Sequence, residues 1–199
     1  MKLDKKGRGV LASYEAVRRM SVDMLRVHLQ RMGERLGRSL DARLATVLAE
    51  GDSSGSGTAP VVMNTATADT WVYGDLVAAY MKLSQEHYFT PTHMLADNAT
   101  AQSILKLSEI ADSNLFDFAK TGNLPTPLGV QLVPMADQPA DTLTLVDAGF
   151  AVQKLTEQDL LVESDKLISQ QWDRTYLTVV TDFAITYDKA RVVMTSDWS

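Results

Sequence analysis

The chain has 199 residues, with 25 acidic and 19 basic side chains that give a formal net charge of −6. Hydrophobic residues make up 45% and charged residues 22%, which favours a sizeable core and argues against a generally disordered chain. Cysteine is absent, which excludes disulfides, thiolate metal sites and cysteine nucleophiles. We expect no signal peptide and no membrane span, because charged residues interrupt every apolar segment. The sequence therefore predicts one domain or two small lobes.

Charge is distributed unevenly along the chain. Residues 1–50 hold 11 basic and 6 acidic side chains, whereas residues 51–199 hold 8 basic and 19 acidic ones. Such asymmetry indicates nucleic acid binding by the basic part, or docking between complementary surfaces of two copies. A solvated helix face of mixed charge would explain it equally well.

The first predicted elements lead into a long helix. Gly9–Ala12 is a short apolar run typical of a strand, and Ser13 offers a hydroxyl cap for one or two helical turns over Ala16–Met20. A single helix over residues 21–50 follows, because apolar residues recur there at steps of three and four: Leu25, Leu29, Met32, Leu36, Leu40, Leu44 and Val47.

Two glycines lie inside this predicted helix. Gly33 and Gly37 should each cost about 1 kcal/mol relative to alanine at an exposed site. We expect the helix to stay continuous, because packing of its apolar face outweighs both penalties. We also expect another element to pack close to the glycines.

The middle of the chain predicts helices around one strand. Residues 51–60 are small and polar and predict an exposed loop, and a helix is expected from Thr70 to near His87. His93–Ala96 predicts a strand, and Asp97 caps a helix that continues through Leu107. Residues 108–127 predict a loop-rich segment. A strand between two helices indicates an α/β lobe.

The rest of the chain predicts mainly strands. A short helix is expected over Asp165–Thr175, and a tight turn over Tyr187–Ala190. Six segments are candidate strands: Gly129–Pro134, Thr142–Asp147, Phe150–Leu155, Leu160–Glu163, Tyr176–Tyr187 and Arg191–Thr195. Helices therefore come first and strands follow.

No set of residues predicts a catalytic, cofactor-binding or metal site. Gly55-Ser56-Gly57 lies in the predicted loop and not at a strand-to-helix elbow, and the loop lacks the lysine of a phosphate-binding loop. The 25 acidic residues supply many accidental carboxylate pairs, which carry no information. A metal could in principle use His87 and His93 with Glu86, but the spacing of these two histidines fits no recurrent zinc motif. The histidines are His28, predicted on the flank of the long helix, His87 and His93.

Arginine and tryptophan residues have simple structural explanations. Seven arginines could attract nucleic acid, but they are spread around the helix and alternate with Asp23, Glu34 and Asp41, which disfavours a specific reader. Packing in a core or an interface is a simpler role for the tryptophans than base stacking. These residues are Arg18, Arg19, Arg26, Arg31, Arg35, Arg38 and Arg43, and Trp71, Trp172 and Trp198.

Segments along nearly the whole chain form an ordered series. The series is Lys5–Glu15 before the long helix, Leu48–Asp52 at its close, Pro91–Asp97, Lys120–Leu132, Leu143–Asp147, Val162–Glu163, Val179–Tyr187 and Ala190–Val193. In this order it resembles the major capsid protein of tailed double-stranded DNA phages. That family has the Hong Kong 97-like fold, which encapsulins share. Only the end of the family's extended loop would fit in residues 1–12.

The resemblance implies an α+β fold with two domains. A peripheral domain would comprise residues 1–60 and 148–199, including the spine helix over residues 21–50, and an axial domain would comprise residues 61–147. The axial tip would lie around Gly122–Gly129.

The resemblance also implies a function. The chain would be a structural subunit, not an enzyme, and would self-assemble into an icosahedral capsid around packaged double-stranded DNA. Its partners would be further copies in pentamers and hexamers, portal and scaffolding proteins, and DNA contacted non-specifically, with no cofactor and no membrane. Its location would be the virion capsid, assembled in the host cytoplasm. An encapsulin-like compartment shell and a small α/β enzyme remain the alternatives.

Overall fold

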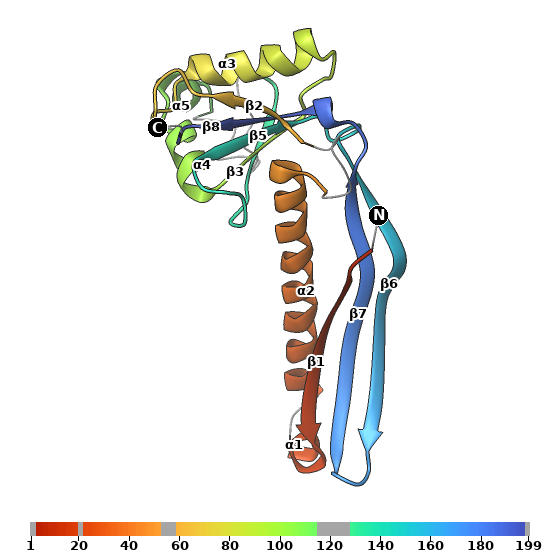
Figure 1. The fold of residues 1–199 in the computed structure, drawn as a ribbon. Helices are drawn as coiled ribbons and strands as arrows, with labels where there is room; N and C mark the ends of the chain where they lie inside the picture. Colours follow the sequence, from red (N-terminus) through yellow and green to blue (C-terminus); the bar gives the residue numbers. More distant parts are fainter. Residues whose placement is uncertain (1–2, 20–21, 53–58, 115–127, 198–199) are drawn as a thin grey trace. The chain divides into compact units, whose positions relative to one another are not determined.

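The chain folds into two compact units, each built from segments that are far apart in the sequence. Unit 1 joins Met1–Arg43 to Lys154–Phe183, and unit 2 joins Leu44–Gln153 to Ala184–Ser199 (Figure 1). The structure is a computed structural model that describes residues 3–19, 22–52, 59–114 and 128–197.

The three-stranded sheet of unit 1 contains the longest strands of the chain. Its order is β1 (Lys5–Ser13), β7 (Trp172–Ile185) and β6 (Val152–Leu167). β1 and β7 are antiparallel, with Lys5 opposite Val180 and Ser13 opposite Trp172. β1 is longer than the strand predicted over Gly9–Ala12, because pairing with β7 also recruits its polar and glycine residues.

Two helices accompany this sheet. Ser13 Oγ accepts a hydrogen bond of 3.2 Å from the backbone N–H of Ala16 and so begins the short helix α1 (Tyr14–Arg19), as predicted. α2 (Val22–Glu50) runs without a break through Met32–Arg38, which confirms the prediction of one continuous helix.

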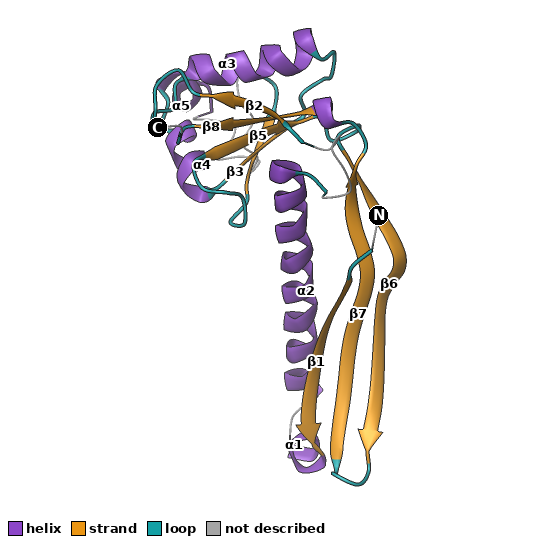
Figure 2. Ribbon diagram, viewed as in Figure 1, coloured by secondary structure: helices purple, strands orange, loops and turns teal. Residues whose placement is uncertain are grey.

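The apolar stripe of α2 packs on the sheet of unit 1. Leu36 is 4% exposed and forms a core cluster with Leu177 and Val179 of β7. Leu29, Met32 and Leu40 flank this cluster, as their spacing predicts. Figure 2 shows α2 alongside β1, β7 and β6.

The glycines of α2 have no close neighbour in the part of the chain that the structure describes. A Cβ atom built on Gly33 or Gly37 meets no atom within 4 Å. The expectation of a closely packed element at these positions was therefore wrong for the described residues.

The hairpin of β6 and β7 corrects two further predictions. A single strand, β6, covers the two separate strands expected over Phe150–Leu155 and Leu160–Glu163. The helix expected over Asp165–Thr175 is absent from these described residues, because strand pairing continues to a tight turn at Ile168–Gln171. Gln171 has a φ of 56° within that turn.

An ion pair between α2 and β7 lies within unit 1. Arg43 donates to both carboxylate oxygens of Asp182, at 2.9 Å from Nε and 3.3 Å from Nη2. The side chain of Asp182 is only 5% exposed. Burial alone would raise the pKa of this carboxyl, but hydrogen bonds from Arg43 and the backbone N–H of Phe183 outweigh it and lower the pKa.

Unit 2 contains a mixed five-stranded sheet. Its strands lie in the order β2 (Val61–Asn64), β8 (Arg191–Thr195), β5 (Thr142–Val146), β3 (His93–Ala96) and β4 (Gln131–Pro134). β2 pairs with β8 and β3 with β4 in parallel, whereas β5 is antiparallel to both β8 and β3. β2 was not predicted, since four residues carry too little pattern to identify an edge strand.

The helices of unit 2 bury apolar residues with its sheet. α3 (Tyr73–Met81) begins after the predicted Thr70 and continues as a π-helical turn over Lys82–Glu86. Asp97 accepts hydrogen bonds from two backbone N–H groups at the start of α4 (Asn98–Leu105), which confirms the predicted cap. α5 (Ser108–Asn114) occupies part of the segment predicted to be loop-rich. Leu76, Leu83, Met94, Ile104 and Leu145 are among the fully buried core residues.

The charged residues Asp52, Asp75, Asp147 and Arg191 are buried among the described residues of unit 2. Asp52 is 7% exposed and accepts a hydrogen bond of 3.0 Å from the backbone N–H of Ile185, so the predicted exposed loop does not begin before residue 53. Residues 53–58 of that loop lie outside the described residues. Arg191 is fully buried, and this desolvation lowers the pKa of its guanidinium. The negative charges of Asp188 and Asp52 act in the other direction and raise the pKa by less.

The compact units differ in extent from the predicted domains. β8 lies within the predicted peripheral range 148–199, yet it pairs with β2 and β5 in the sheet of unit 2. The roles of peripheral and axial domain in assembly stay a prediction. Residues 122–127 of the predicted axial tip lie outside the described residues.

Substitution of the two glycines of α2 by alanine tests whether the space beside them is open. Gly33→Ala and Gly37→Ala should each raise the free energy of unfolding by about 1 kcal/mol, because helix propensity improves and no neighbour obstructs the new methyl group. Gly129→Ala is the matched control and should destabilise by about 1 kcal/mol, since Gly129 has a φ of 73°. Urea unfolding measures all three, and a loss of stability in the helix variants would contradict the prediction.

Removing Arg43 tests the ion pair. Arg43→Met should lower the free energy of unfolding at pH 7 by about 2–3 kcal/mol, because the carboxylate of Asp182 stays buried without its partner. The difference in free energy of unfolding between the variant and wild type should shrink below about pH 4.

The sign of the pH effect follows from the protonation of Asp182. Its pKa is lowered in the folded chain, so the stabilisation by the ion pair is complete above the ordinary carboxyl pKa and is lost as the pH falls through the folded pKa. In the Arg43→Met variant, protonation of Asp182 removes its uncompensated buried charge and so reduces the loss of stability. A difference from wild type that stays constant with pH would rule out this explanation.

Candidate functional site: the exposed surfaces of unit 1

The sheet of unit 1 has two open edges. β1 and β6 are its outer strands, and among the described residues no strand pairs with the outer edge of either one. β6 has 16 residues, and most of them are exposed. Unpaired backbone N–H and C=O groups along such an edge promote pairing with another chain. The edges of unit 1 are therefore candidate contact surfaces.

Exposed apolar side chains lie on all three strands of unit 1 and in the turn between β6 and β7. Ile168, in the turn, is 80% exposed, and Val162 on β6 is 56% exposed. Contiguous exposed apolar surface marks a site of protein interaction. We call this group the hairpin end: Leu11, Leu160, Leu161, Val162, Ile168, Trp172 and Tyr176.

One face of the sheet at the hairpin end is open. Leu177 and Val179 face α2, so the alternate residues of β7, including Tyr176, point to the other face. Gly9 lies opposite Tyr176, and a Cβ built on Gly9 would be 2.6 Å from the tyrosine ring. The ring therefore lies directly against the backbone of β1. A shallow hollow of about 470 Å³ on this face is lined by Gly9, Val10, Leu11, Leu167, Gln170, Arg174 and Tyr176.

Polar contacts order this open face. Arg174 forms an ion pair with Asp165 across the hairpin, and its guanidinium carbon lies 5.9 Å from the centre of the Tyr176 ring. The hydrogen bond to Asp165 raises the pKa of Arg174. These contacts fix side-chain positions on the sheet face and leave the apolar residues beside them exposed.

The two open edges carry opposite charge. β1 contains Lys5, Lys6 and Arg8 and no acidic residue. β6 has a net negative charge, from Lys154, Glu157, Asp159, Glu163, Asp165 and Lys166. Opposite charges of this kind can guide two copies of a chain into one register.

The histidines do not converge on a metal site in the part of the chain that the structure describes. Groups of three or more potential metal ligands are absent from those residues. His28 is exposed on α2, and His93 on β3 has Nδ1 at 2.9 Å from Thr92 Oγ1. His87 follows the π-helical turn, with its Nε2 buried. The predicted lack of catalytic, cofactor and metal residues stays a prediction.

The tryptophans separate into two environments. Trp71 is 8% exposed in the core of unit 2, as expected for a packing residue. Trp172 is 36% exposed at the hairpin end, and Trp198 lies outside the described residues. In the described residues, no helix combines the length and the apolar character required to cross a membrane.

The described residues thus form a long helix packed on a three-stranded sheet in unit 1 and a mixed sheet with its own core in unit 2. Residues 1–194 match the model of the family described as phage capsid protein. The chain belongs to this family. It is a structural protein of an icosahedral phage shell and not an enzyme, so the alternative of a small α/β enzyme is wrong.

Solved structures confirm the predicted α+β fold of the Hong Kong 97 type. The chain is similar to a chain of Mycobacterium phage Che8, with 12% identity, a TM-score of 0.75, and coverage of 97% of this chain and 71% of that one. It is similar to the capsid of the native GTA particle, with 15% identity, a TM-score of 0.76, and coverage of 98% of this chain and 73% of that one. It is also similar to the holo-SrpI encapsulin complex from Synechococcus elongatus PCC 7942, with 14% identity, a TM-score of 0.69, and coverage of 98% of this chain and 74% of that one. Comparison with curated proteins finds no match.

Proposed function

We propose that copies of this chain tile the phage shell as pentamers and hexamers, with unit 1 as the peripheral domain and unit 2 as the axial domain. Unit 1 contains most of the predicted spine helix, and unit 2 contains the whole of the predicted axial range 61–147. The hairpin end carries the proposal, because it exposes apolar side chains that a monomer would leave in water.

The contact between neighbours is heterologous. Around a five-fold or six-fold axis, one surface of each copy meets a different surface of the next, and repetition closes a ring. The basic edge β1 and the acidic edge β6 supply two unlike surfaces of this kind. Burial of apolar area at the hairpin end would supply strength, and the charges would set the register.

The finer partners and location follow from the resemblance to the family. Portal and scaffolding proteins would bind the assembling shell, double-stranded DNA would fill it, and assembly would take place in the host cytoplasm. An encapsulin-like compartment shell shares only the fold with this chain, whereas residues 1–194 match the family described as phage capsid protein.

A charge at the hairpin end tests the proposed interface. Ile168→Glu should weaken each contact between copies by about 2 kcal/mol, or about 30-fold in dissociation constant, because a buried isoleucine becomes a buried carboxylate. The thermal stability of the subunit should stay unchanged, since Ile168 is 80% exposed. Sedimentation velocity and electron microscopy measure the assembly.

Ser169→Glu is the matched control. It adds the same charge in the same turn, at another exposed residue, but removes no apolar side chain. It should leave assembly unchanged. Equal assembly of the Ile168→Glu variant and the wild type would refute the role of the hairpin end.

Salt should weaken association of the purified 199-residue chain. We expect a monomer or a small ring whose population falls between about 50 and 500 mM salt, because screening shortens the range of the attraction between exposed charges. Sedimentation at both salt concentrations checks this. A strictly monomeric chain at high concentration and low salt would contradict docking through charge.

A further inference from the structure

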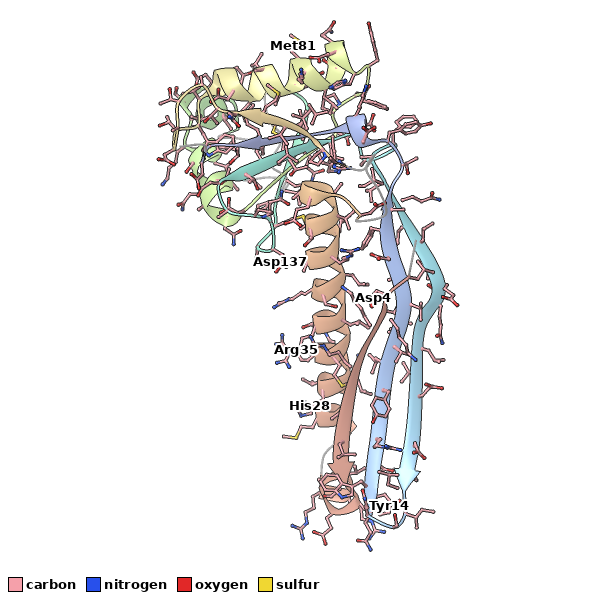
Figure 3. All side chains as sticks on the ribbon, viewed as in Figure 1. Asp4, Tyr14, His28, Arg35, Met81 and Asp137 are labelled. Atoms are coloured by element: carbon pink, nitrogen blue, oxygen red, sulfur yellow. The ribbon has the colours of Figure 1, made fainter. Side chains whose placement is uncertain are left out.

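One side of α2 in unit 1 carries a row of exposed basic side chains. The sheet covers the side that contains Leu29, Met32 and Leu36. Successive residues turn by about 100° around a helix, which places the basic residues within one sector of about 80° beside the covered side. Figure 3 shows Arg35 and His28 on the side of α2 away from the three strands. We call this row the basic stripe: His28, Arg31, Arg35 and Arg38.

The arginines of the basic stripe are accessible to a ligand. The side chain of Arg31 is 70% exposed and lies 3.1 Å from Glu34, which also accepts from Gln30 at 3.2 Å. Among the described residues, no carboxylate lies within 4.0 Å of the guanidinium group of Arg35 or Arg38. A hollow of about 420 Å³ between the stripe residues is lined by His28, Arg31, Met32, Glu34, Arg35 and Arg38.

Arginine fits phosphate by its chemistry. The planar guanidinium donates two parallel hydrogen bonds to a phosphate group and keeps its charge at every physiological pH. At 1.5 Å per residue, the basic stripe is about 15 Å long. Phosphates recur at regular intervals along each strand of duplex DNA, so a row of this length can contact several of them. A straight row of cations therefore matches a linear polyanion.

We expect the stripe to contact the phosphate backbone and not to recognise sequence, because acidic residues alternate with the arginines along α2 and disfavour a specific reader.

We propose that the basic stripe is the surface through which each subunit contacts the phosphate backbone of packaged double-stranded DNA. The side of α2 that carries it then lines the interior of the shell. This inference rests on the proposed function for the presence of DNA, but binding itself is a property of the single subunit.

Duplex binding by the purified chain tests the proposal. The probe is a fluorescent 30-base-pair duplex of arbitrary sequence, measured by anisotropy over a series of salt concentrations. The triple variant Arg31→Gln/Arg35→Gln/Arg38→Gln should reduce the slope of log K against log salt by about 2.7, or 0.9 for each lost phosphate contact. For wild type, these three contacts should weaken binding by about 40-fold between 50 and 200 mM salt.

A matched control removes the same charge elsewhere. Lys106→Gln/Lys154→Gln/Lys166→Gln changes three exposed lysines outside α2 and should leave the slope within about 0.5 of wild type. Equal slopes for the wild type and the arginine variant would overturn the proposal. An equal reduction of the slope in both triple variants would also overturn it, because the slope would then respond to net charge alone.

Glu34→Gln provides a second, independent variant. It removes the carboxylate beside Arg31, and should raise duplex affinity several-fold without disturbing the helix. Unchanged or weaker binding by this variant would count against the stripe.

Assembly separates this proposal from the proposed function. The arginine variant should still form the oligomers of wild type. If it lost assembly and kept wild-type duplex affinity, the stripe would contact another subunit and the proposal would be wrong. If wild type stayed strictly monomeric at high concentration and low salt but bound the duplex through the stripe, the proposed contacts between copies would fail and the binding surface would stand.

Discussion

The packing of α2 on the sheet of unit 1 is the contact on which the other surfaces depend. Leu36 meets Leu177 and Val179 across it, and Arg43 reaches Asp182, a residue 139 positions away in the sequence. An isolated two-stranded hairpin is marginal in water, so β6 and β7 need both β1 and the helix to persist as a long ribbon. The helix likewise needs the sheet, because two glycines reduce its intrinsic stability.

This packing also determines what stays exposed. The sheet uses one side of α2, which leaves the basic stripe in solvent, and the helix uses one face of the sheet, which leaves Tyr176 and Leu11 on the other. Open strand edges and exposed apolar residues promote aggregation in a protein that works as a monomer. In a shell subunit the same edges and side chains are suited to contact with neighbouring copies.

The low identity to similar structures has a physical explanation. Chains with 12–15% identity share this fold with TM-scores of 0.69–0.76 over nearly the full length of this chain. A structural subunit needs an apolar stripe on one helix, strands that pair, and surfaces that complement each other. Many sequences satisfy these requirements, because they concern residue classes and spacing. A catalytic site would instead require particular side chains at fixed distances.

Local patterns in the sequence determined α2, the cap at Asp97 and the strands β3 and β8. Each is encoded within one short segment or one helical period, so neighbouring residues suffice to predict it. The order of such segments along nearly the whole chain carried the family resemblance. Tertiary structure alone decided the continuous hairpin in place of the helix expected over Asp165–Thr175, the edge strand β2 and the burial of Asp52. It also decided which arginines of α2 share an open side. These features depend on pairing between distant segments. An exposed strand such as β6 lacks the alternation of apolar and polar residues that would predict it from sequence, so its pairing with β7 decides its structure.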